Sequence, residues 1–231
     1  MDPEAGTLEA FYASPIQHPG LLWLAAGIAI AFCLSKRGLS RSLRRYCVTL
    51  AILSFADAWL TSSPVFGLGT LQGWLASGVP LFFVLAGDYR YLFFVLTATA
   101  GGEIEPRAKS LLVAAGLTFI VPILSQVALL LLPDSLASAR MLFLIYEVGF
   151  VVLTLSLMRW HPQIRTIPWT GSVSRFVVLY YSLWASADLL ILTTGLDLGY
   201  GLRVLPNLLY YGGLIATFAW FAPREPAPQA R

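Results

Sequence analysis

Charged residues are scarce in this chain. Only 12% of its 231 residues are Asp, Glu, Lys or Arg, whereas 58% are hydrophobic. Because soluble proteins average about a quarter charged residues, this composition excludes an ordinary soluble domain. The mean hydropathy is +0.74, and the length accommodates several stretches of the ~20 apolar residues that cross a bilayer. The composition therefore predicts an all-α, polytopic membrane bundle.

Histidine, cysteine and lysine are also rare, with two residues of each type. His18 and His161 lie outside the apolar runs, while Cys33 and Cys47 lie near run ends. This distribution has neither the ligand spacing of a metal site nor a Ser/His pair suited to proteolysis within the membrane. Nucleotide-binding motifs are lacking too. We therefore expect no metal, no other cofactor and no nucleic-acid partner.

Seven apolar runs predict seven transmembrane helices. They cover residues 20–35, 46–63, 74–99, 110–132, 141–158, 176–195 and 204–222. Because these runs fill most of the chain, residues 1–222 are predicted to form a single seven-helix transmembrane domain. The Pro-rich residues 223–231 are expected to form a disordered cytoplasmic tail.

The basic residues predict how the bundle is oriented. Twelve lysines and arginines fall in the tail and in the connections after the first, third and fifth runs, whereas the opposite side holds only Arg140 and Arg203. Cytoplasmic loops of membrane proteins are enriched in Lys and Arg. We therefore expect the amino terminus outside and the carboxyl terminus in the cytoplasm, in a bacterial inner membrane. The acidic start lacks a basic signal region, so the first run is read as a retained span.

A possible internal repeat relates the two halves of the chain. Arg44 precedes Asp57 by thirteen residues, and Arg175 precedes Asp188 by the same interval. In each copy a pair of hydroxyl residues and a Gly-x-Gly follow, at Ser62-Ser63 and Gly67/Gly69, and at Thr193-Thr194 and Gly199/Gly201. The pattern predicts a 3+1+3 parallel repeat, with units 20–99 and 141–222 joined by helix 110–132. Chance similarity remains the alternative, because Arg at helix starts and Gly at turns are common.

Five ionisable residues fall within the predicted spans, namely Asp57, Asp88, Arg90, Glu147 and Asp188. Because charges at bilayer depth cost a few kcal/mol or more, such residues normally face the bundle interior or a wet cavity. Asp88 and Arg90 stand two positions apart and point to different helix faces. We therefore expect Arg90 to pair with an acid of another span. The acids that remain unpaired would be protonated or solvated, which predicts a proton-titrating site; an inter-helix lock is the alternative.

Polar and aromatic side chains in the outer halves of three spans predict a substrate-binding pocket. Tyr180 and Trp184 lie on the same helix face as Asp188, at intervals of four residues, and Pro206 bends or begins the seventh span. The predicted substrate-binding residues are Gln126, Tyr180, Trp184, Asn207, Tyr210 and Tyr211. Interfacial aromatic belts and polar contacts between helices are the alternative explanation.

Two known families share this layout. The order of seven spans resembles that of the microbial rhodopsins, and Trp184 is similar in position to residues that pack against their retinal ring. The two lysines, Lys36 and Lys109, both lie outside the seventh run, so the retinal Schiff base of that family has no residue to form it. The 3+1+3 arrangement resembles the SWEET and PQ-loop carriers, with Pro80 and Pro206 in bending positions, and this resemblance implies transport.

The leading functional prediction is a proton-linked transporter that binds a small molecule in the outer half of the bundle. Parallel repeats, bent helices and acids within the spans are typical of carriers. One alternative is a metal-independent membrane enzyme that acts on a lipid or isoprenoid, with two acids as general acid and base. Another is a non-catalytic sensory or interaction subunit. The expected partners are membrane lipids and a small-molecule ligand, and an oligomer is compatible with the sequence.

Overall fold

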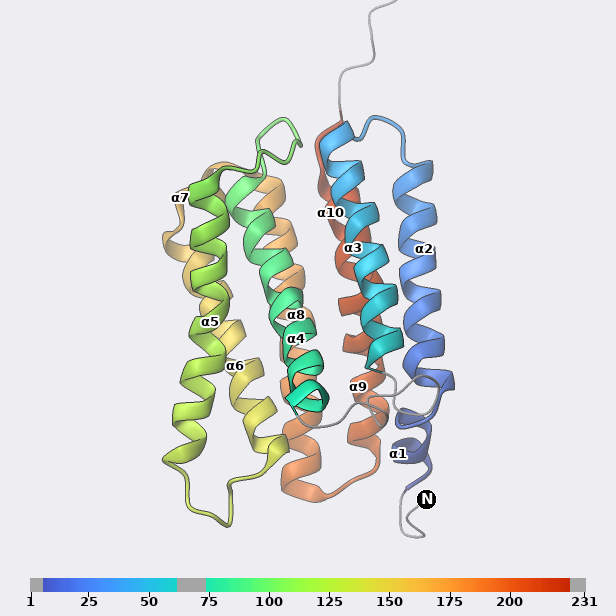
Figure 1. The fold of residues 1–231 in the computed structure, drawn as a ribbon, viewed down its shortest axis with the longest axis vertical. Helices are drawn as coiled ribbons and strands as arrows, with labels where there is room; N and C mark the ends of the chain where they lie inside the picture. Colours follow the sequence, from blue (N-terminus) through green and yellow to red (C-terminus); the bar gives the residue numbers. More distant parts are fainter. Residues whose placement is uncertain (1–5, 62–73, 225–231) are drawn as a thin grey trace, which may run out of the picture.

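Long helices that run side by side make up the protein (Figure 1). The computed structural model describes residues 6–61 and 74–224, and within these ranges the chain forms helices and no strand. This confirms the all-α prediction. In chain order the elements are α1 (Thr7–Tyr12), the π-helical turn η1 (Ile16–Leu21), α2 (Leu22–Ser35), α3 (Arg41–Leu60), α4 (Trp74–Thr97), α5 (Ala108–Leu130), α6 (Ala139–Trp160), α7 (Pro162–Thr166), α8 (Pro168–Thr194), α9 (Leu198–Leu208), the π-helical turn η3 (Leu209–Gly213) and α10 (Leu214–Phe221).

Within the described ranges, five helical segments are long and apolar enough to cross a membrane. They are Ile16–Ser35, Ala108–Leu130, Ala139–Trp160, Pro168–Thr194 and Leu198–Phe221. Large apolar side chains are exposed along α5, including Leu112 at 74% and Leu130 at 83%. A surface of this kind suits contact with lipid acyl chains rather than with water.

The helices extend beyond the apolar runs at several ends. The predicted span 46–63 begins five residues earlier as helix α3, because the Ser40 hydroxyl accepts the backbone N–H of Leu43 at 3.2 Å and caps a first turn rich in arginine. The last two predicted spans likewise begin earlier, at Pro168 and Leu198. Hydrophobicity marks the part of a helix that suits lipid, whereas capping decides where the helix begins. Residues 62 and 63, the first Gly-x-Gly of the repeat and the tail from residue 225 lie outside the described residues.

The two ends of the bundle differ in charge. The α2–α3 and α4–α5 connections, α7 and the carboxyl end of the described chain all lie at one end, which we call the α7 end (Figure 1). The basic residues of those connections gather there, including Arg41, Arg107 and Arg165. The opposite end carries α1, the α5–α6 connection and the α8–α9 turn, and we call it the α1 end.

Helix α8 occupies a central position, because it packs against α6, α7, α9 and α10. Glycines allow some neighbouring helices to approach closely. A Cβ added at Gly212 would lie 2.4 Å from the Ala25 carbonyl oxygen of α2, and one added at Gly199 would lie 3.0 Å from the Ala187 carbonyl oxygen of α8. Close backbone contact through small residues is the usual way in which transmembrane helices associate.

The contact at Gly212 leads to a stability prediction. Replacing Gly212 with Ala forces α2 away from η3, so we expect a loss of about 1–3 kcal/mol of unfolding free energy, typical of an overpacked core. Thermal unfolding of the purified protein in detergent measures the change. The matched control is Gly116→Ala, because a Cβ at Gly116 meets no atom within 4 Å. Equal unfolding midpoints for the two variants would contradict the close packing of α2 against η3.

Candidate functional site

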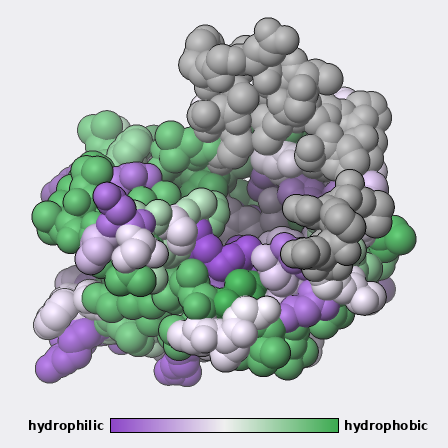
Figure 2. All heavy atoms as spheres, turned by 90° about the horizontal axis from the view of Figure 1, so that it is seen from below, coloured by the Kyte–Doolittle hydropathy of each residue, from purple (hydrophilic) through white to green (hydrophobic). Residues whose placement is uncertain are grey.

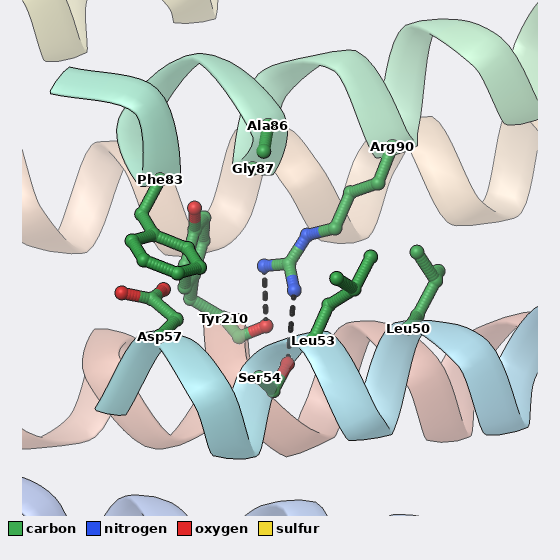
Figure 3. A pocket seen from close by; sticks show the side chains of 9 residues that line it. All are labelled: Leu50, Leu53, Ser54, Asp57, Phe83, Ala86, Gly87, Arg90 and Tyr210. Atoms are coloured by element: carbon green, nitrogen blue, oxygen red, sulfur yellow. Dashed lines mark hydrogen bonds between the residues drawn. The ribbon is translucent and has the colours of Figure 1, made fainter. Parts of the chain in front are cut away.

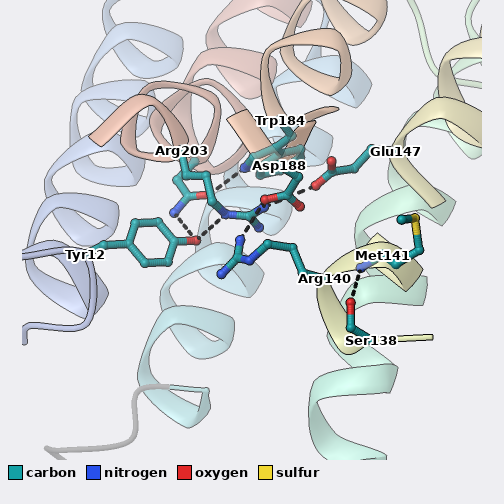
Figure 4. Close-up of polar contacts among 9 residues, drawn as sticks. Tyr12, Ser138, Arg140, Met141, Glu147, Trp184, Asp188 and Arg203 are labelled. Carbon is teal, nitrogen blue, oxygen red and sulfur yellow. Dashed lines mark hydrogen bonds and ion pairs between the residues drawn. The ribbon is translucent and has the colours of Figure 1, made fainter. Parts of the chain in front are cut away.

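Two acids and two arginines from three helices meet near the α1 end (Figure 4). Arg140 of α6 contacts Asp188 of α8, with Nη1 2.7 Å from Oδ1. Arg203 of α9 also binds Asp188 through Nη1, and the same nitrogen lies 3.6 Å from Oε1 of Glu147. We call these four residues the carboxylate–arginine cluster. Its two positive and two negative charges can balance one another, as burial in a bundle requires.

Local sequence features bring the four side chains together. The Ser138 hydroxyl accepts the Met141 N–H at 3.1 Å and thereby fixes the start of α6 beside Arg140. Gly195 ends α8 with a φ of +66°, a left-handed conformation that favours glycine. The chain then reverses and α9 runs back along α8, so that Arg203 lies opposite Asp188.

Helix α1 is attached to this cluster. The Tyr12 hydroxyl accepts hydrogen bonds from Arg203 Nε at 3.2 Å and from Asn207 Nδ2 at 3.4 Å. The Asp197 carboxylate accepts the backbone N–H groups of Leu8 and Glu9, each at 2.8 Å. An acid at a helix amino terminus supplies acceptors to otherwise unpaired N–H groups. The amino-terminal segment is therefore held against α9 by directional polar contacts.

A second polar site lies between α3, α4 and η3 (Figure 3). It is a cavity of about 30 Å³, more than the roughly 10–15 Å³ that a cavity needs to hold one water molecule. We call it the Arg90 pocket. Its walls are Leu50, Leu53, Ser54, Asp57, Phe83, Ala86, Gly87, Arg90 and Tyr210. Figure 3 shows Arg90 of α4 and Asp57 of α3 at the same pocket.

The Arg90 guanidinium is held by neutral groups. Its Nη2 donates to the Tyr210 carbonyl at 2.6 Å, its Nη1 lies 3.4 Å from the Ser54 hydroxyl, and its centre lies 3.9 Å from the centroid of the Tyr210 ring. Nε has no hydrogen-bond partner in the described chain. Arg90 also forms no ion pair within 4.0 Å there. The expectation of a direct pair with another span's acid was thus wrong, because Arg140 and Arg203 engage Asp188, and Arg203 also reaches Glu147.

The π-helical turn η3 presents the carbonyl that Arg90 uses. Pro206 has no N–H, and the hydrogen-bond pattern after it shifts, with the Leu214 N–H bonding to the Leu209 carbonyl. Such turns change which backbone groups are available to side chains. Gly87 makes room on the other side, because a Cβ at that position would overlap the Tyr210 hydroxyl. The carbonyl that Arg90 uses therefore belongs to the π-helical turn that follows Pro206.

Asp88 faces away from the Arg90 pocket. Its carboxylate accepts hydrogen bonds from the hydroxyls of Tyr146 on α6 and Tyr181 on α8, and the residue is 1% exposed. Arg90, two residues later, contacts α3 and η3 instead. This separation agrees with the helical geometry expected for positions i and i+2.

Aromatic rings fill the space between the two charged sites. Trp184 lies 5.2 Å from Tyr210 between ring centroids and donates through Nε1 to the Asn207 side chain at 2.9 Å. Tyr211 lies close enough to Asp57 for its hydroxyl to interact with the carboxylate. A continuous series of contacts therefore leads from Arg90 through Tyr210, Trp184, Asn207 and Tyr12 to Arg203. The aromatic cluster consists of Tyr180, Tyr181, Trp184, Tyr210 and Tyr211.

Most of the predicted site residues meet in this region, and one does not. Gln126 is exposed on α5, and no hydrogen bond joins it to the described cluster. Tyr12, Tyr146, Tyr181, Arg140 and Arg203 belong to the region although the sequence did not indicate them. Arg140 and Arg203 were assigned to topology because they flank apolar runs. Their contacts with Asp188 depend on the packing of α6 and α9 against α8, which the sequence positions of the two arginines do not show.

A space-filling view along the helices shows where hydrophilic residues lie at the α1 end. Seen from the α1 end, hydrophilic side chains lie in a hollow among hydrophobic ones (Figure 2). Among the described residues, no group of three or more His, Cys, Asp and Glu side chains could hold a metal ion. The arrangement can bind charge and hold or release protons on carboxylates. Comparison with models of protein families, with curated proteins and with solved structures gave no match.

The carboxylate–arginine cluster leads to a second stability prediction. Replacing Asp188 with Asn leaves Arg140 without its carboxylate and Arg203 with Glu147 alone, so we expect a loss of about 3–5 kcal/mol, typical of a broken buried pair. Thermal unfolding in detergent measures the change. Asp134→Asn is the control, because Asp134 is exposed in the α5–α6 connection. A loss no greater than that of the control would contradict a structural role for the cluster.

Proposed function

We propose that this protein is a proton-linked transporter of a small solute. The observation that supports the proposal is the Arg90 pocket, where a buried arginine without an ion pair within 4.0 Å in the described chain and a buried aspartate line the same small cavity. Arg keeps its charge at all physiological pH values, whereas Asp can take up a proton. Protonation of Asp57 therefore changes the net charge of the pocket, which is the property that couples a solute to a proton.

The membrane topology is part of the same proposal. Helices α3 and α4 run alongside the five apolar segments (Figure 1), and we propose that they cross the membrane as well, which gives seven spans. The basic connections gather at the α7 end, so this end would face the cytoplasm of a bacterium and the α1 end the outside. The 3+1+3 repeat, in which α3 and its neighbours correspond to α8 and its neighbours, also belongs to the proposal.

The carboxylate–arginine cluster fits the role of a closure at the α1 end. It joins α6, α8 and α9 through ion pairs and reaches α1 through Tyr12. Opening it would require these partners to separate, which costs free energy unless the charges find new partners or water. The contact series through Trp184 and Tyr210 gives the cluster a physical connection to the Arg90 pocket. In a carrier, such a connection lets solute binding in the Arg90 pocket affect whether the carboxylate–arginine cluster is open or closed.

A metal-independent membrane enzyme is the second candidate, and one observation favours it. Glu147 and Asp188 both bind Arg203, and each has one buried carboxylate oxygen without a hydrogen-bond partner in the described chain. Two acids in different surroundings are what general acid and base catalysis needs. A changed lipid or isoprenoid in extracts of expressing cells would favour this candidate over transport.

Reconstitution into proteoliposomes with an internal pH dye tests the transport proposal. We expect at least one solute from a panel of sugars, amino acids, carboxylates, inorganic anions and amines to drive a pH change. Replacing Asp57 with Asn should reduce the coupled proton flux at least tenfold, because the amide cannot carry the proton. The exposed control Asp134→Asn should behave as the unmodified protein does.

Two results would contradict the transport proposal. One is a flux no greater than that of protein-free liposomes for every solute of the panel. The other is solute-driven proton movement that persists unchanged in the Asp57→Asn variant, because the proton would then be carried elsewhere.

A further inference from the structure

The geometry of the Arg90 pocket points to the class of solute. We propose that the pocket binds a small monovalent anion, of halide or formate size, beside Arg90 when Asp57 is protonated. This inference rests on the proposed function for its physiological meaning, since it names the solute class for the same site. The binding step can nevertheless be tested without any transport.

Arg90 supplies the positive charge and an unused donor. It is 7% exposed, and its Nε has no hydrogen-bond partner in the described chain. Its other contacts are to a carbonyl, a hydroxyl and the face of a ring, all of which are neutral. A guanidinium buried among neutral groups lacks the counter-charge that such burial normally demands. An anion in the adjoining cavity provides it.

While no anion is bound, Asp57 balances the charge of Arg90 from beyond ion-pair distance. It lines the same cavity and is 8% exposed, but it forms no ion pair with Arg90 within 4.0 Å. When Asp57 is ionised, a second anion in the cavity would meet a negative wall. When it is protonated, the repulsion disappears and Arg90 is free to attract the anion. The anion and the proton therefore enter the site as a neutral pair, which lowers the cost of burying either charge.

The small volume of the cavity favours a small anion. About 30 Å³ is available, more than the roughly 10–15 Å³ that one water molecule needs. A monatomic halide or a formate ion is small enough for this space, whereas a larger organic anion would meet Phe83, Leu53 or Tyr210 in the walls. The walls are partly apolar, and weakly hydrated anions tolerate such surroundings better than multivalent ones.

Other titratable groups near the pocket could also make anion binding depend on pH, so their contribution must be distinguished from that of Asp57. Asp88 of α4 is turned toward Tyr146 and Tyr181. His18 of η1 contacts the Thr61 hydroxyl at 3.0 Å, and Thr61 in turn contacts Asp57. The titratable groups nearest to Asp57 or Arg90 on the surrounding elements are His18, Tyr46, Tyr180, Tyr181, Tyr210 and Tyr211. Asp88 acts on Arg90 through its charge but lies on the other face of α4. Of these, His18 has the ordinary titration range closest to neutrality.

The test measures how bromide shifts the unfolding temperature of the purified protein in detergent. Bromide replaces gluconate in the buffer, so that the ionic strength stays constant. A ligand that binds only the folded state raises this temperature in a saturable way. We expect half-saturation at a bromide concentration at least tenfold lower at pH 5 than at pH 8. Formate should act similarly, and sulfate should not.

Four variants identify the groups responsible. Arg90→Gln should abolish the saturable shift, while Arg175→Gln, which removes an exposed arginine, should leave it intact. Asp57→Asn should bind bromide equally at pH 5 and pH 8, at least as tightly as the unmodified protein does at pH 5. His18→Gln should retain the pH dependence. If Arg90→Gln does not fold, the inference is tested by comparing the pH dependence of bromide binding in Asp57→Asn with that in the unmodified protein.

Several results would overturn the inference. They are an unchanged bromide response in Arg90→Gln, a pH dependence that survives in Asp57→Asn, or the absence of any saturable bromide shift at pH 5. Bromide binding at Arg90 without flux in proteoliposomes would leave the anion site standing and refute transport. Coupled flux of an uncharged solute, without bromide binding, would refute the anion site and leave transport standing.

Discussion

The burial of charge inside an apolar helical bundle is the constraint on which the rest of this structure depends. Each ionisable side chain there must find a partner, because the lipid offers neither water nor counter-ions. Asp188 meets this demand with two arginines and is fully buried at 0% exposure. Asp88 meets it with two tyrosine hydroxyls. These partnerships determine how α6, α8 and α9 are placed around one another, and α4 against α6 and α8.

Arg90 departs from this rule, and the departure marks the candidate site. It is buried, as the other charges are, yet its hydrogen bonds go to neutral groups. The features that hold it there are a π-helical turn after Pro206 and a glycine at position 87, which is small enough to admit the Tyr210 hydroxyl. Natural proteins often place such local irregularities where backbone groups must serve a ligand or a side chain. The aromatic cluster then connects this pocket to the carboxylate–arginine cluster near the α1 end.

Much of the polar site could be predicted from the sequence, because the rarity of charge makes each exception visible. Asp57, Asp88, Arg90, Glu147 and Asp188 are all buried, as the cost of exposing them to lipid demands. The aromatic residues on the Asp188 face were found through helical periodicity, which is a local property of the chain. Gln126 shares the polar character of the set but lies exposed on α5, since sequence position alone does not tell which way a helix faces.

The sequence by itself determined the helical class, the apolar segments and the residues that cannot face lipid, because hydrophobicity and helical period are carried by neighbouring residues. Only the tertiary structure decided which side chains these buried polar residues contact. Arg203 reaches Asp188 only because the turn at Gly195 folds α9 back along α8, and Arg90 meets Tyr210 only because α4 lies beside η3. Pairing depends on the distance between segments that are far apart in the chain, and that distance is fixed by packing rather than by any local pattern.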